Sequence, residues 1–359
     1  MKTNRTRIAP TRIPQAARDA LRILFVAKHA KWEGDLHPED GNHAVYHREM
    51  RTILDDIGVN LSIADSYDVL FKRPAADFVF PLLNRAGFLN SEMLLPLLCE
   101  RQGIPYLGAS PILRGLSDDK HLTKLEARAH RVPTAQWAVF RKGAPVDPDL
   151  YPTAKRWVIK PNASSASWGV RDATDIDGVS DAIAAIHADG HDALVEPFLS
   201  GSDVEVPVIT IDGCPHIMPM MLFEQADPTH LRTYAEKRDL VDRAQKYSLV
   251  HFDDARLSRQ IEAMTQALIP IFAPFDYGRF EFRVDEISGD IEFLEVNLNC
   301  NLWSQKVFGR SAGLAGISQH ELIETILAES LMRHGLCDRD VNLGTICSER
   351  YETRLFAAA

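Results

Sequence analysis

Two strand-length segments in the last third of the chain, Tyr277 to Val284 and Ile291 to Leu298, alternate apolar and polar side chains on either side of a short polar turn. This period of two is typical of strands with one buried and one polar face, and it predicts an antiparallel β-hairpin. With the turn centred on Ser288, Glu281 lies opposite Glu295 on the polar face. A turn one residue tighter would bury the charged face, so this register is favoured.

The polar face of this hairpin brings carboxylates and an amide together. Two carboxylates set opposite each other on a partly buried face share a proton or need a cation between them. Mg²⁺ prefers oxygen ligands, of which one or two are carboxylates while water and phosphates supply the rest. Glu281, Glu295 and Asn297 therefore indicate one wall of a nucleotide and metal site. The alternative is a solvent-exposed face on which Arg279 and Arg283 pair with the acids.

Upstream of the hairpin, the pattern of strands and helices changes once. From residue 21 to about 110, apolar runs such as LRILFVAK and DFVFPLL alternate with helical patterns such as HAVYHREMRTILDDIG, which predicts a parallel α/β sheet. IPYLG is expected to be the last strand of that sheet. From Ser117 onward a helix is followed by shorter strands, and Asp212-Gly213 marks a second hairpin turn.

The length of the chain, 359 residues, exceeds the usual size of one domain, so several compact units are expected. The first residues are basic and lack the apolar core of a secretory signal, so we interpret them as a flexible leader. The predicted division is a leader over 1–20, an N-terminal α/β domain over 21–113, a central subdomain over 114–205, a C-terminal subdomain over 206–335 and a tail over 336–359.

Composition and charge narrow the class of partner. The chain is 45% hydrophobic and 25% charged, and its formal net charge of -10 argues against nucleic acid or an anionic membrane as the main partner. No apolar run has the length of a membrane span. The five cysteines have no metal-binding spacing and their number is odd, so we expect reduced thiols, no disulfide and a cytoplasmic location.

Cations and small residues in the central part indicate a phosphate site. Lys160 ends an apolar strand, and the small residues of the run Asn162 to Gly169 let backbone N–H groups close around an anion. This run is not a P-loop, because no Lys follows its glycine, and a flexible surface loop is the alternative. The segment Val195 to Val206 joins two strands, and its main chain can read a base: Pro197 can only accept a hydrogen bond, whereas Leu199 can donate one.

Together and in this order, these segments resemble the ATP-grasp superfamily, and within it the D-alanine–D-alanine ligase-like branch. The resemblance rests on LSDDKHLTK, VIKPNASSASWGV, VEPFLSGSDVEV and the hairpin GRFEFRV with IEFLEVNLN, and it covers about Leu21 to His334. It implies an ATP-grasp fold with an N-terminal parallel α/β domain, a central lid domain and a C-terminal catalytic domain. It also implies an ATP- and Mg²⁺-dependent ligase that joins a carboxylate to an amine through an acyl phosphate and releases ADP and phosphate.

The resemblance implies a role for each residue that matches a family motif. For ATP it implies phosphate contacts from Lys120, Lys160 and Lys237, adenine contacts from Glu196, Pro197 and Leu199, and a ribose contact from Asp203. For catalysis it implies Arg279 at the transferring phosphoryl group, together with Lys237 and the lid serine Ser167. For metal binding it implies two Mg²⁺ ions, replaceable by Mn²⁺, on Glu281, Glu295 and Asn297.

The sequence departs from the family pattern at the acceptor end. The lid reads Ser165-Ala166-Ser167 where the family has Gly-Ser-Ser, Arg238 replaces a tyrosine, and NLNCNLWSQK lacks the Pro-Gly of the second-substrate loop. The ATP half is kept and the acceptor half is rewritten, so D-alanyl-D-alanine synthesis is disfavoured. Two alternatives stay open: intramolecular cyclisation of a modified amino acid, and a non-catalytic nucleotide-binding module, against which the intact Arg279 argues.

The candidates for the substrate site are polar or aromatic residues in the rewritten segments, and ordinary packing or surface exposure is the alternative for each: His43, Tyr46, Trp168, Arg238, Asn299, Trp303, Ser304, Gln305 and Lys306. Lys306 is a candidate cation for a substrate carboxylate. Cys300 could face the substrate, although a buried inert thiol is favoured. The expected partners are small-molecule carboxylates and amines, and family habit suggests a homodimer.

Overall fold

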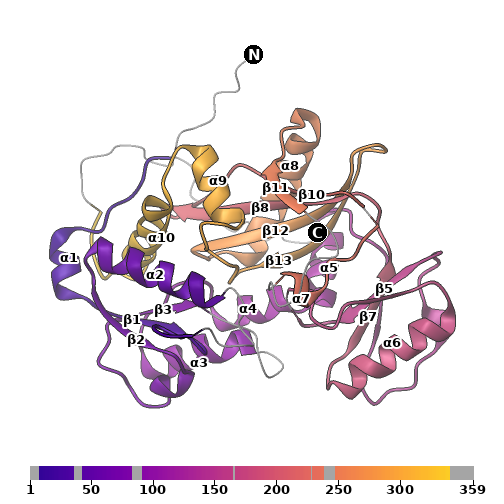
Figure 1. The fold of residues 1–359 in the computed structure, drawn as a ribbon, viewed down its shortest axis with the longest axis horizontal. Coiled ribbons are helices and arrows are strands. Elements are labelled where there is room, and N and C mark those ends of the chain that lie inside the picture. Colours follow the sequence, from indigo (N-terminus) through magenta and orange to yellow (C-terminus); the bar gives the residue numbers. More distant parts are fainter. Residues whose placement is uncertain are drawn as a thin grey trace, which may run out of the picture.

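The structure, a computed structural model, describes residues 8–35, 43–82, 91–164, 166–227, 229–237 and 247–339. Its helices are α1 (Gln15–Ala20), α2 (His43–Ile57), α3 (Ser91–Gln102), α4 (Pro111–Asp118), α5 (Lys120–Ala129), α6 (Ile176–Ala188), α7 (Tyr234–Lys237), α8 (Ala255–Phe272), α9 (Val307–Ala315) and α10 (Gln319–Arg333), with 3₁₀ turns η1 (Tyr67–Leu70) and η2 (Pro148–Leu150). Its strands are β1 (Arg22–Ala27), β2 (Asn60–Ala64), β3 (Phe78–Leu82), β4 (Ala138–Phe140), β5 (Trp157–Pro161), β6 (Arg171–Ala173), β7 (Ala193–Pro197), β8 (Ser202–Ile211), β9 (Cys214–Ile217), β10 (Met221–Gln225), β11 (Tyr247–His251), β12 (Tyr277–Asp285) and β13 (Asp290–Asn297). Figure 1 shows three sheets, with the largest between the other two.

The N-terminal part is a parallel sheet with helices on both faces, as the sequence predicts. Its strand order is β2-β1-β3, and β1 pairs in parallel with both neighbours. Alternate residues of β1 point to opposite faces: Phe25 shares a core cluster with Met50 of α2, whereas Val26 shares one with Leu98 of α3. IPYLG, expected as a full strand, contributes a single parallel bridge through Tyr106.

The expectation of a flexible leader is wrong for residues 8–20. Helix α1 lies in this segment, and Ile13 is only 2% exposed in a core that also contains α10. Arg12 and Arg18 pair with Glu324 of α10 at 2.5 Å and 2.8 Å. A carboxylate as buried as Glu324 needs such cations. Local composition could not reveal this contact, because its partner lies near the other end of the chain.

The beginning of the expected tail is also packed. Leu336 and Cys337 lie partly buried against the core that contains α10. Arg339 pairs with Glu329 of α10 at 2.7 Å. Residues 1–7 and 340–359 lie outside the described residues, and the boundaries between the three larger units remain predictions.

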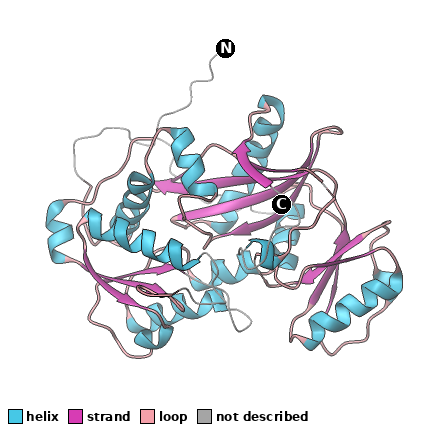
Figure 2. Cartoon of the chain, in the orientation of Figure 1, coloured by secondary structure: helices cyan, strands magenta, loops and turns pink. Residues whose placement is uncertain are grey.

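A four-stranded antiparallel sheet in the order β4-β7-β5-β6 forms the central unit. Figure 2 shows α6 lying along one face of this sheet. Ile159 of β5 and Val195 of β7 share a core cluster with Ile183 of α6. Because successive strand residues point to opposite faces, Lys160 and Glu196 point away from α6 and toward the large sheet.

The large sheet has the strand order β11-β10-β8-β12-β13, with β9 paired to β8, and all these pairs are antiparallel. The apolar side of β8 and β12 shares a core cluster with α8, which includes Val206, Phe280 and Leu268. The predicted turn at Asp212-Gly213 is confirmed, since both residues have positive φ, 54° and 70°, and connect β8 to β9.

The predicted register of the β12–β13 hairpin is confirmed at its functional end. Glu281 lies opposite Glu295, and Arg279 lies opposite Asn297. Nearer the turn the register shifts by one residue, because Phe282 pairs with Phe293 and leaves the intervening residue of β13 as a bulge. Beyond the bulge Arg283 lies opposite Glu292, so polar groups of β12 and β13 face the same side on either side of the bulge.

One expectation from the sequence about the cysteines is wrong. Cys214 is disulfide-bonded, so the expectation of no disulfide fails, whereas Cys99, Cys300 and Cys337 are free.

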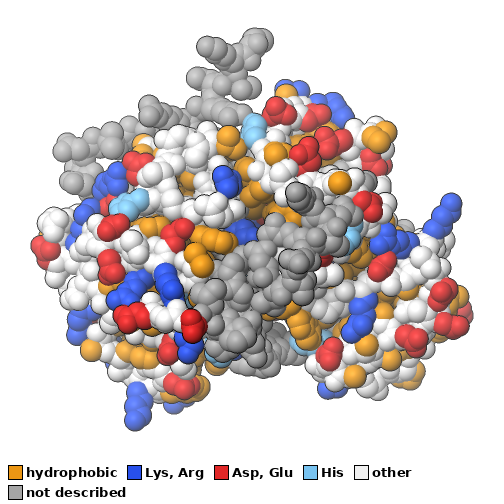
Figure 3. All heavy atoms as spheres, in the orientation of Figure 1, with side chains coloured by type: hydrophobic (Ala, Val, Ile, Leu, Met, Phe, Trp, Pro, Cys, Tyr) orange, Lys and Arg blue, Asp and Glu red, His pale blue; other side chains and the backbone are white. Residues whose placement is uncertain are grey.

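Within the described ranges, no helix has the length and apolar character to cross a membrane. Figure 3 shows basic and acidic side chains interspersed over the visible face, with no large area of one sign.

Candidate functional site

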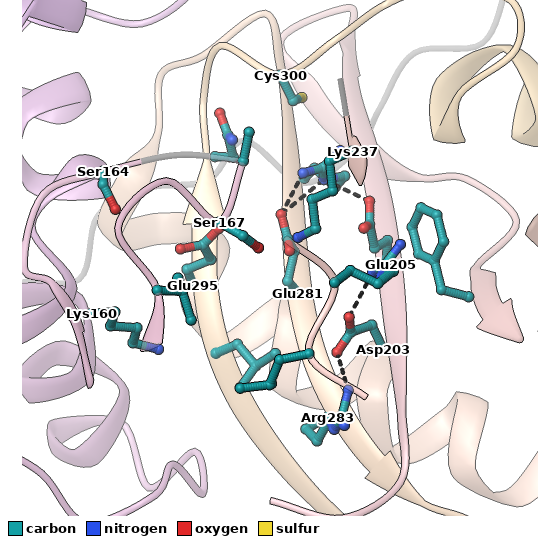
Figure 4. A pocket seen from close by; sticks show the side chains of 18 of the residues that line it. Lys160, Ser164, Ser167, Asp203, Glu205, Lys237, Glu281, Arg283, Glu295 and Cys300 are labelled. Atoms are coloured by element: carbon teal, nitrogen blue, oxygen red, sulfur yellow. Dashed lines mark hydrogen bonds and ion pairs between the residues drawn. The ribbon is translucent and has the colours of Figure 1, made fainter. Parts of the chain in front are cut away.

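A cavity of about 320 Å³ is lined by the two antiparallel sheets. Lys160 of β5 and Glu196 of β7 line it from the smaller sheet, and Asp203, Glu205 and Glu281 line it from β8 and β12 of the large sheet. Figure 4 shows Lys160 on the side of the smaller sheet and the three acids along the strands of the larger one. Segments far apart in the sequence thus meet at one site.

Three carboxylates form a row across the large sheet. Glu205 of β8 and Glu295 of β13 lie opposite Glu281 of β12, one on each side. Arg279 lies beside this row, with its Nε 2.8 Å from Glu205 Oε2 and its Nη2 2.5 Å from Glu281 Oε1. Glu205 was not among the predicted residues, although the alternation of Asp203-Val-Glu205-Val on β8 carries the same signal as the hairpin.

Burial and the crowding of acids in this row raise the pKa of Glu281. The pKa of Glu281 rises to about 7, chiefly because of burial; Arg279 opposes the rise, and the charges of Glu205 and Glu295 add to it. A divalent cation between Glu281 and Glu295 would remove this excess of negative charge. Among the described residues, no group of three or more His, Cys, Asp or Glu could hold a metal unaided. Glu281, Glu295 and Asn297 are oxygen ligands of the kind that Mg²⁺ prefers, and oxygens of a phosphate ligand would complete the set.

Two predicted phosphate contacts approach this row from helices. Lys120, the first residue of α5, has its Nζ 3.2 Å from Glu295 Oε2, and this Nζ donates to the Ser164 carbonyl at 2.7 Å. Lys237, the last residue of α7, also lines the cavity. Burial, followed by the charge of Arg232, lowers the pKa of Lys237. The structure thus brings together lysines that lie more than a hundred residues apart.

The segment predicted to read the base carries a buried charge cluster. Glu196 forms ion pairs with Lys160 and with Lys124, the latter at 2.9 Å. Burial opposes ionisation of Glu196, but the two ammonium groups outweigh it and hold its pKa at about 2. Its side chain is therefore engaged with lysines. Pro197 and Leu199 line the cavity, where their main-chain groups remain candidates for the base.

Asp203, the acid predicted to bind the ribose, forms ion pairs with two arginines. Asp203 lies 2.7 Å from Arg232 Nη2 and 2.8 Å from Arg283 Nη1. Burial works against its ionisation, yet the two guanidinium groups hold the pKa of Asp203 far below its usual range. Arg232 also lies over the ring of Phe223, with 3.9 Å between its Cζ and the ring centroid. Neither arginine was assigned to the site from the sequence, although Arg283 lies opposite Asp203 on the paired strands.

The far end of the cavity is formed by the N-terminal unit and by the loop after β13. Four predicted substrate residues line it: His43, Tyr46, Asn299 and Lys306. Tyr46 is 4% exposed, and its hydroxyl accepts a hydrogen bond from the Leu302 N–H at 3.0 Å. Helix α2 therefore holds the loop that follows β13.

Three other predicted substrate residues are engaged elsewhere. Trp303 Nε1 donates to Glu49 Oε2 at 3.0 Å, and the Ser304 hydroxyl donates to the same oxygen at 2.7 Å. The Ser304 N–H donates to Glu49 Oε1 at 3.1 Å. Trp168 packs on His191, with 4.9 Å between the ring centroids. These three residues are absent from the lining of the cavity as far as the described residues define it.

Of the remaining candidates, some line the cavity and others do not. Ser167 lines the cavity from the lid, with a φ of 62°, whereas Gln305 is exposed and accepts a hydrogen bond from Arg310. Arg238 lies outside the described residues. Cys300 lines the cavity and is 5% exposed, and burial raises the pKa of its thiol to about 12. It is therefore a buried thiol that stays protonated at neutral pH.

Comparisons with known proteins give the family of this chain. A family model described as D-ala D-ala ligase C-terminus matches residues 131–328. A D-alanine–D-alanine ligase of Maridesulfovibrio salexigens is 28% identical over 273 residues, which cover 73% of this chain and 87% of that ligase. The uncharacterized protein y4sG of Sinorhizobium fredii is 28% identical over 236 residues, which cover 65% of this chain and 68% of that protein.

A solved structure shares the fold. The crystal structure of the D-alanine–D-alanine ligase from Bacillus anthracis complexed with ATP superposes with a TM-score of 0.69 at 19% sequence identity. The superposition covers 88% of this chain and 99% of that one. The mixed helix and sheet architecture predicted from the sequence is therefore confirmed as an ATP-grasp fold.

Proposed function

This chain belongs to the D-ala D-ala ligase family, and on that premise we propose that it is an ATP- and Mg²⁺-dependent ligase that joins a carboxylate to an amine. The reaction forms an acyl phosphate, which the amine attacks, and it releases ADP and phosphate. The observation that carries the proposal is the row Glu205, Glu281 and Glu295 with Arg279 beside it and Lys120 reaching it. Such a set neutralises and orients a transferring phosphoryl group.

Each part of the cavity has a task in this reaction. Lys120, Lys160 and Lys237 hold phosphate groups by charge, and Arg279 balances the negative charge that develops on the transferred group. Glu281, Glu295 and Asn297 would hold Mg²⁺, which would supply a Lewis acid for the phosphoryl transfer. A module that only binds nucleotides has no need of Arg279 at this place, so its position favours an enzyme.

The acceptor is proposed to differ from D-alanine. In support, the hydroxyl and N–H of Ser304 and the indole N–H of Trp303 are occupied by Glu49 of α2. These donors border the metal strand, where a second substrate would approach. Because the Glu49 carboxylate already accepts the hydrogen bonds of these donors, other groups recognise the amine substrate. Lys306 and His43, which line the cavity, are candidates for this role.

The compartment and the assembly state also remain proposals. Small-molecule carboxylates and amines are the proposed partners, a homodimer is the proposed assembly, and the cytoplasm is the proposed location. The disulfide at Cys214 removes the argument that all thiols are reduced.

The test is a screen of the purified protein with ATP and Mg²⁺ against pooled D- and L-amino acids and dipeptides. ADP and phosphate release are measured, and products are identified by mass spectrometry. Hydroxylamine in a parallel set traps any acyl phosphate as a hydroxamate, whichever amine is the natural one. ADP, phosphate and a condensed product are expected. AMP and pyrophosphate as products would contradict the mechanism, and a product formed from one molecule alone would indicate cyclisation.

A further inference from the structure

A buried lysine behind the nucleotide side of the cavity has no part in the chemistry described so far. Lys124 of α5 is 0% exposed. Its Nζ lies 2.9 Å from Glu196 Oε2, donates to the Thr134 hydroxyl at 2.8 Å, and lies 5.5 Å from the centroid of the Trp137 ring. Burying an ammonium group costs free energy unless its surroundings match it. These three partners contact the ammonium group, and the charges of Lys160 and Glu292 also act on it.

Lys124 and Lys160 hold the same carboxylate from opposite sides. Oε1 of Glu196 pairs with Lys160, which lines the cavity, and Oε2 pairs with Lys124, which is not among the described lining residues. Within this trio two ammonium groups share one carboxylate, although burial lowers the pKa of Lys124 and the charge of Glu292 also acts on it. Without Lys124, Glu196 would neutralise Lys160, and the wall facing the phosphates would lose its net charge.

The same lysine connects the two sheets that enclose the cavity. The Thr134 hydroxyl, which accepts from Lys124, donates to the Phe293 carbonyl of β13 at 2.8 Å. The Phe293 N–H donates to the Pro133 carbonyl at 2.7 Å. Phe293 lies beside the bulge of β13, two residues before Glu295. A chain of contacts therefore runs from the base-side strand β7 to the strand that carries the metal ligand.

We propose that Lys124 is a positioning residue for the nucleotide phosphates: it holds Glu196 from behind and supplies the positive charge that keeps Lys160 effective at the cavity wall. This inference rests on the proposed function, because it requires a nucleotide between the two sheets. Lys124 itself touches no ligand. Its effect is transmitted through one carboxylate and is specific for ligands that carry phosphates.

The test compares the dissociation constants of Mg·ATP and of adenosine, both measured by competition against a fluorescent ATP analogue. Adenosine shares the base and ribose but has no phosphates. Lys124→Met is expected to weaken ATP about tenfold and adenosine less than about twofold. The double variant Lys124→Met/Glu196→Gln is expected to regain most of the ATP affinity, because Lys160 again carries an unpaired charge. Lys142→Met, the same change at an exposed lysine of the central unit, is the matched control and should leave the ratio of the two constants within about twofold.

The outcomes separate this inference from the proposed function. If Lys124→Met leaves the ratio of the dissociation constants of Mg·ATP and adenosine unchanged, the positioning role is wrong. It is also wrong if the double variant binds ATP more weakly than Lys124→Met does. In either case, ATP binding by the wild type still supports the proposed function. A wild type that binds no ATP overturns both. Should Lys124→Met fail to fold by circular dichroism, Glu196→Gln is compared with the double variant. The inference predicts equal ATP affinities for these two, and a tenfold gap refutes it.

Discussion

The two ends of the cavity are built differently. At the proposed nucleotide end, charged side chains project from paired strands, and ion pairs such as Glu205 with Arg279 and Asp203 with Arg283 fix them in place. At the proposed substrate end, a loop after β13 is held by α2 through Tyr46 and Glu49. Strand pairing fixes the position of a side chain more rigidly than a loop does. The first end can therefore be shared across a family, whereas the second is free to vary with the substrate.

This difference predicts which changes stop the reaction and which only redirect it. Changes at the nucleotide end should reduce kcat for every substrate, because they act on the phosphoryl group that all reactions share. Changes at the substrate end should alter KM for the amine and leave ATP binding intact.

The largest effect is expected at β13, the strand that carries the proposed metal ligands Glu295 and Asn297. Glu295→Gln removes a proposed Mg²⁺ ligand and the partner of Lys120, and kcat should fall about 10³-fold or more, because the transferred charge is no longer stabilised. ADP release measures the rate, and circular dichroism confirms the fold. Glu224→Gln, an exposed change on β10 of the same sheet, is the control and should keep wild-type activity. A fully active Glu295→Gln enzyme would refute the metal role.

A smaller and more selective effect is expected at the substrate end. Glu49→Ala removes the acceptor of three hydrogen bonds from Trp303 and Ser304, so the loop loses its anchor and KM for the amine should rise about tenfold. KM for ATP should stay within about twofold. Steady-state kinetics with each substrate varied in turn separate the two constants. Asp55→Asn, exposed on the same helix, serves as the control. An equal rise in KM for the amine and in KM for ATP would contradict the distinction between the two ends of the cavity.

Stability against acid should report the charge pairs of the nucleotide end. The folded pKa of Glu196, about 2, is below the usual value, so its stabilising effect is present above about pH 4.5 and is lost as the pH falls toward 2. The difference in Tm between the wild type and Glu196→Gln should therefore shrink by at least about 3 °C from pH 6 to pH 3. Thermal melts monitored by circular dichroism measure this. A difference that grows at low pH would mean that Glu196 is neutral in the folded protein.

The smallest effect is expected at Cys300. Because burial raises the pKa of its thiol to about 12, iodoacetamide at pH 8 should leave it unmodified while the less buried Cys337 reacts. Peptide mass spectrometry gives the extent of labelling at each site, and activity should be unchanged. Rapid alkylation of Cys300 with loss of activity would indicate a thiolate at the substrate end.

The sequence predicted the parts of the site that depend on strand alternation. The pairing of Glu281 with Glu295 follows from the period of two and is confirmed. The bulge beside Phe293 could not be predicted, because it depends on hydrogen bonds to Pro133 and Thr134 on a distant segment. Glu205 lies in the same kind of pattern, but the sequence alone does not show that β8 pairs with β12.

Residues whose role depends on distant contacts were harder to place. Trp303 and Ser304 were predicted to face the substrate, but Glu49, which precedes them by about 250 residues, takes their hydrogen bonds. Residues 8–20 looked like a leader because their composition is basic, yet those basic groups serve the buried Glu324. A polar group that satisfies a buried partner cannot be told from a surface group by sequence alone.

The most direct test of the central claim follows oxygen from the carboxylate substrate. The protein is incubated with ATP, Mg²⁺ and pooled amino acids whose carboxylates are labelled with ¹⁸O, and the released phosphate is analysed by mass spectrometry. Transfer of the phosphoryl group to the carboxylate, followed by attack of the amine, leaves one carboxylate oxygen in the phosphate. The account predicts one ¹⁸O in the phosphate for each ADP formed. Unlabelled phosphate, or label found in AMP, would contradict it.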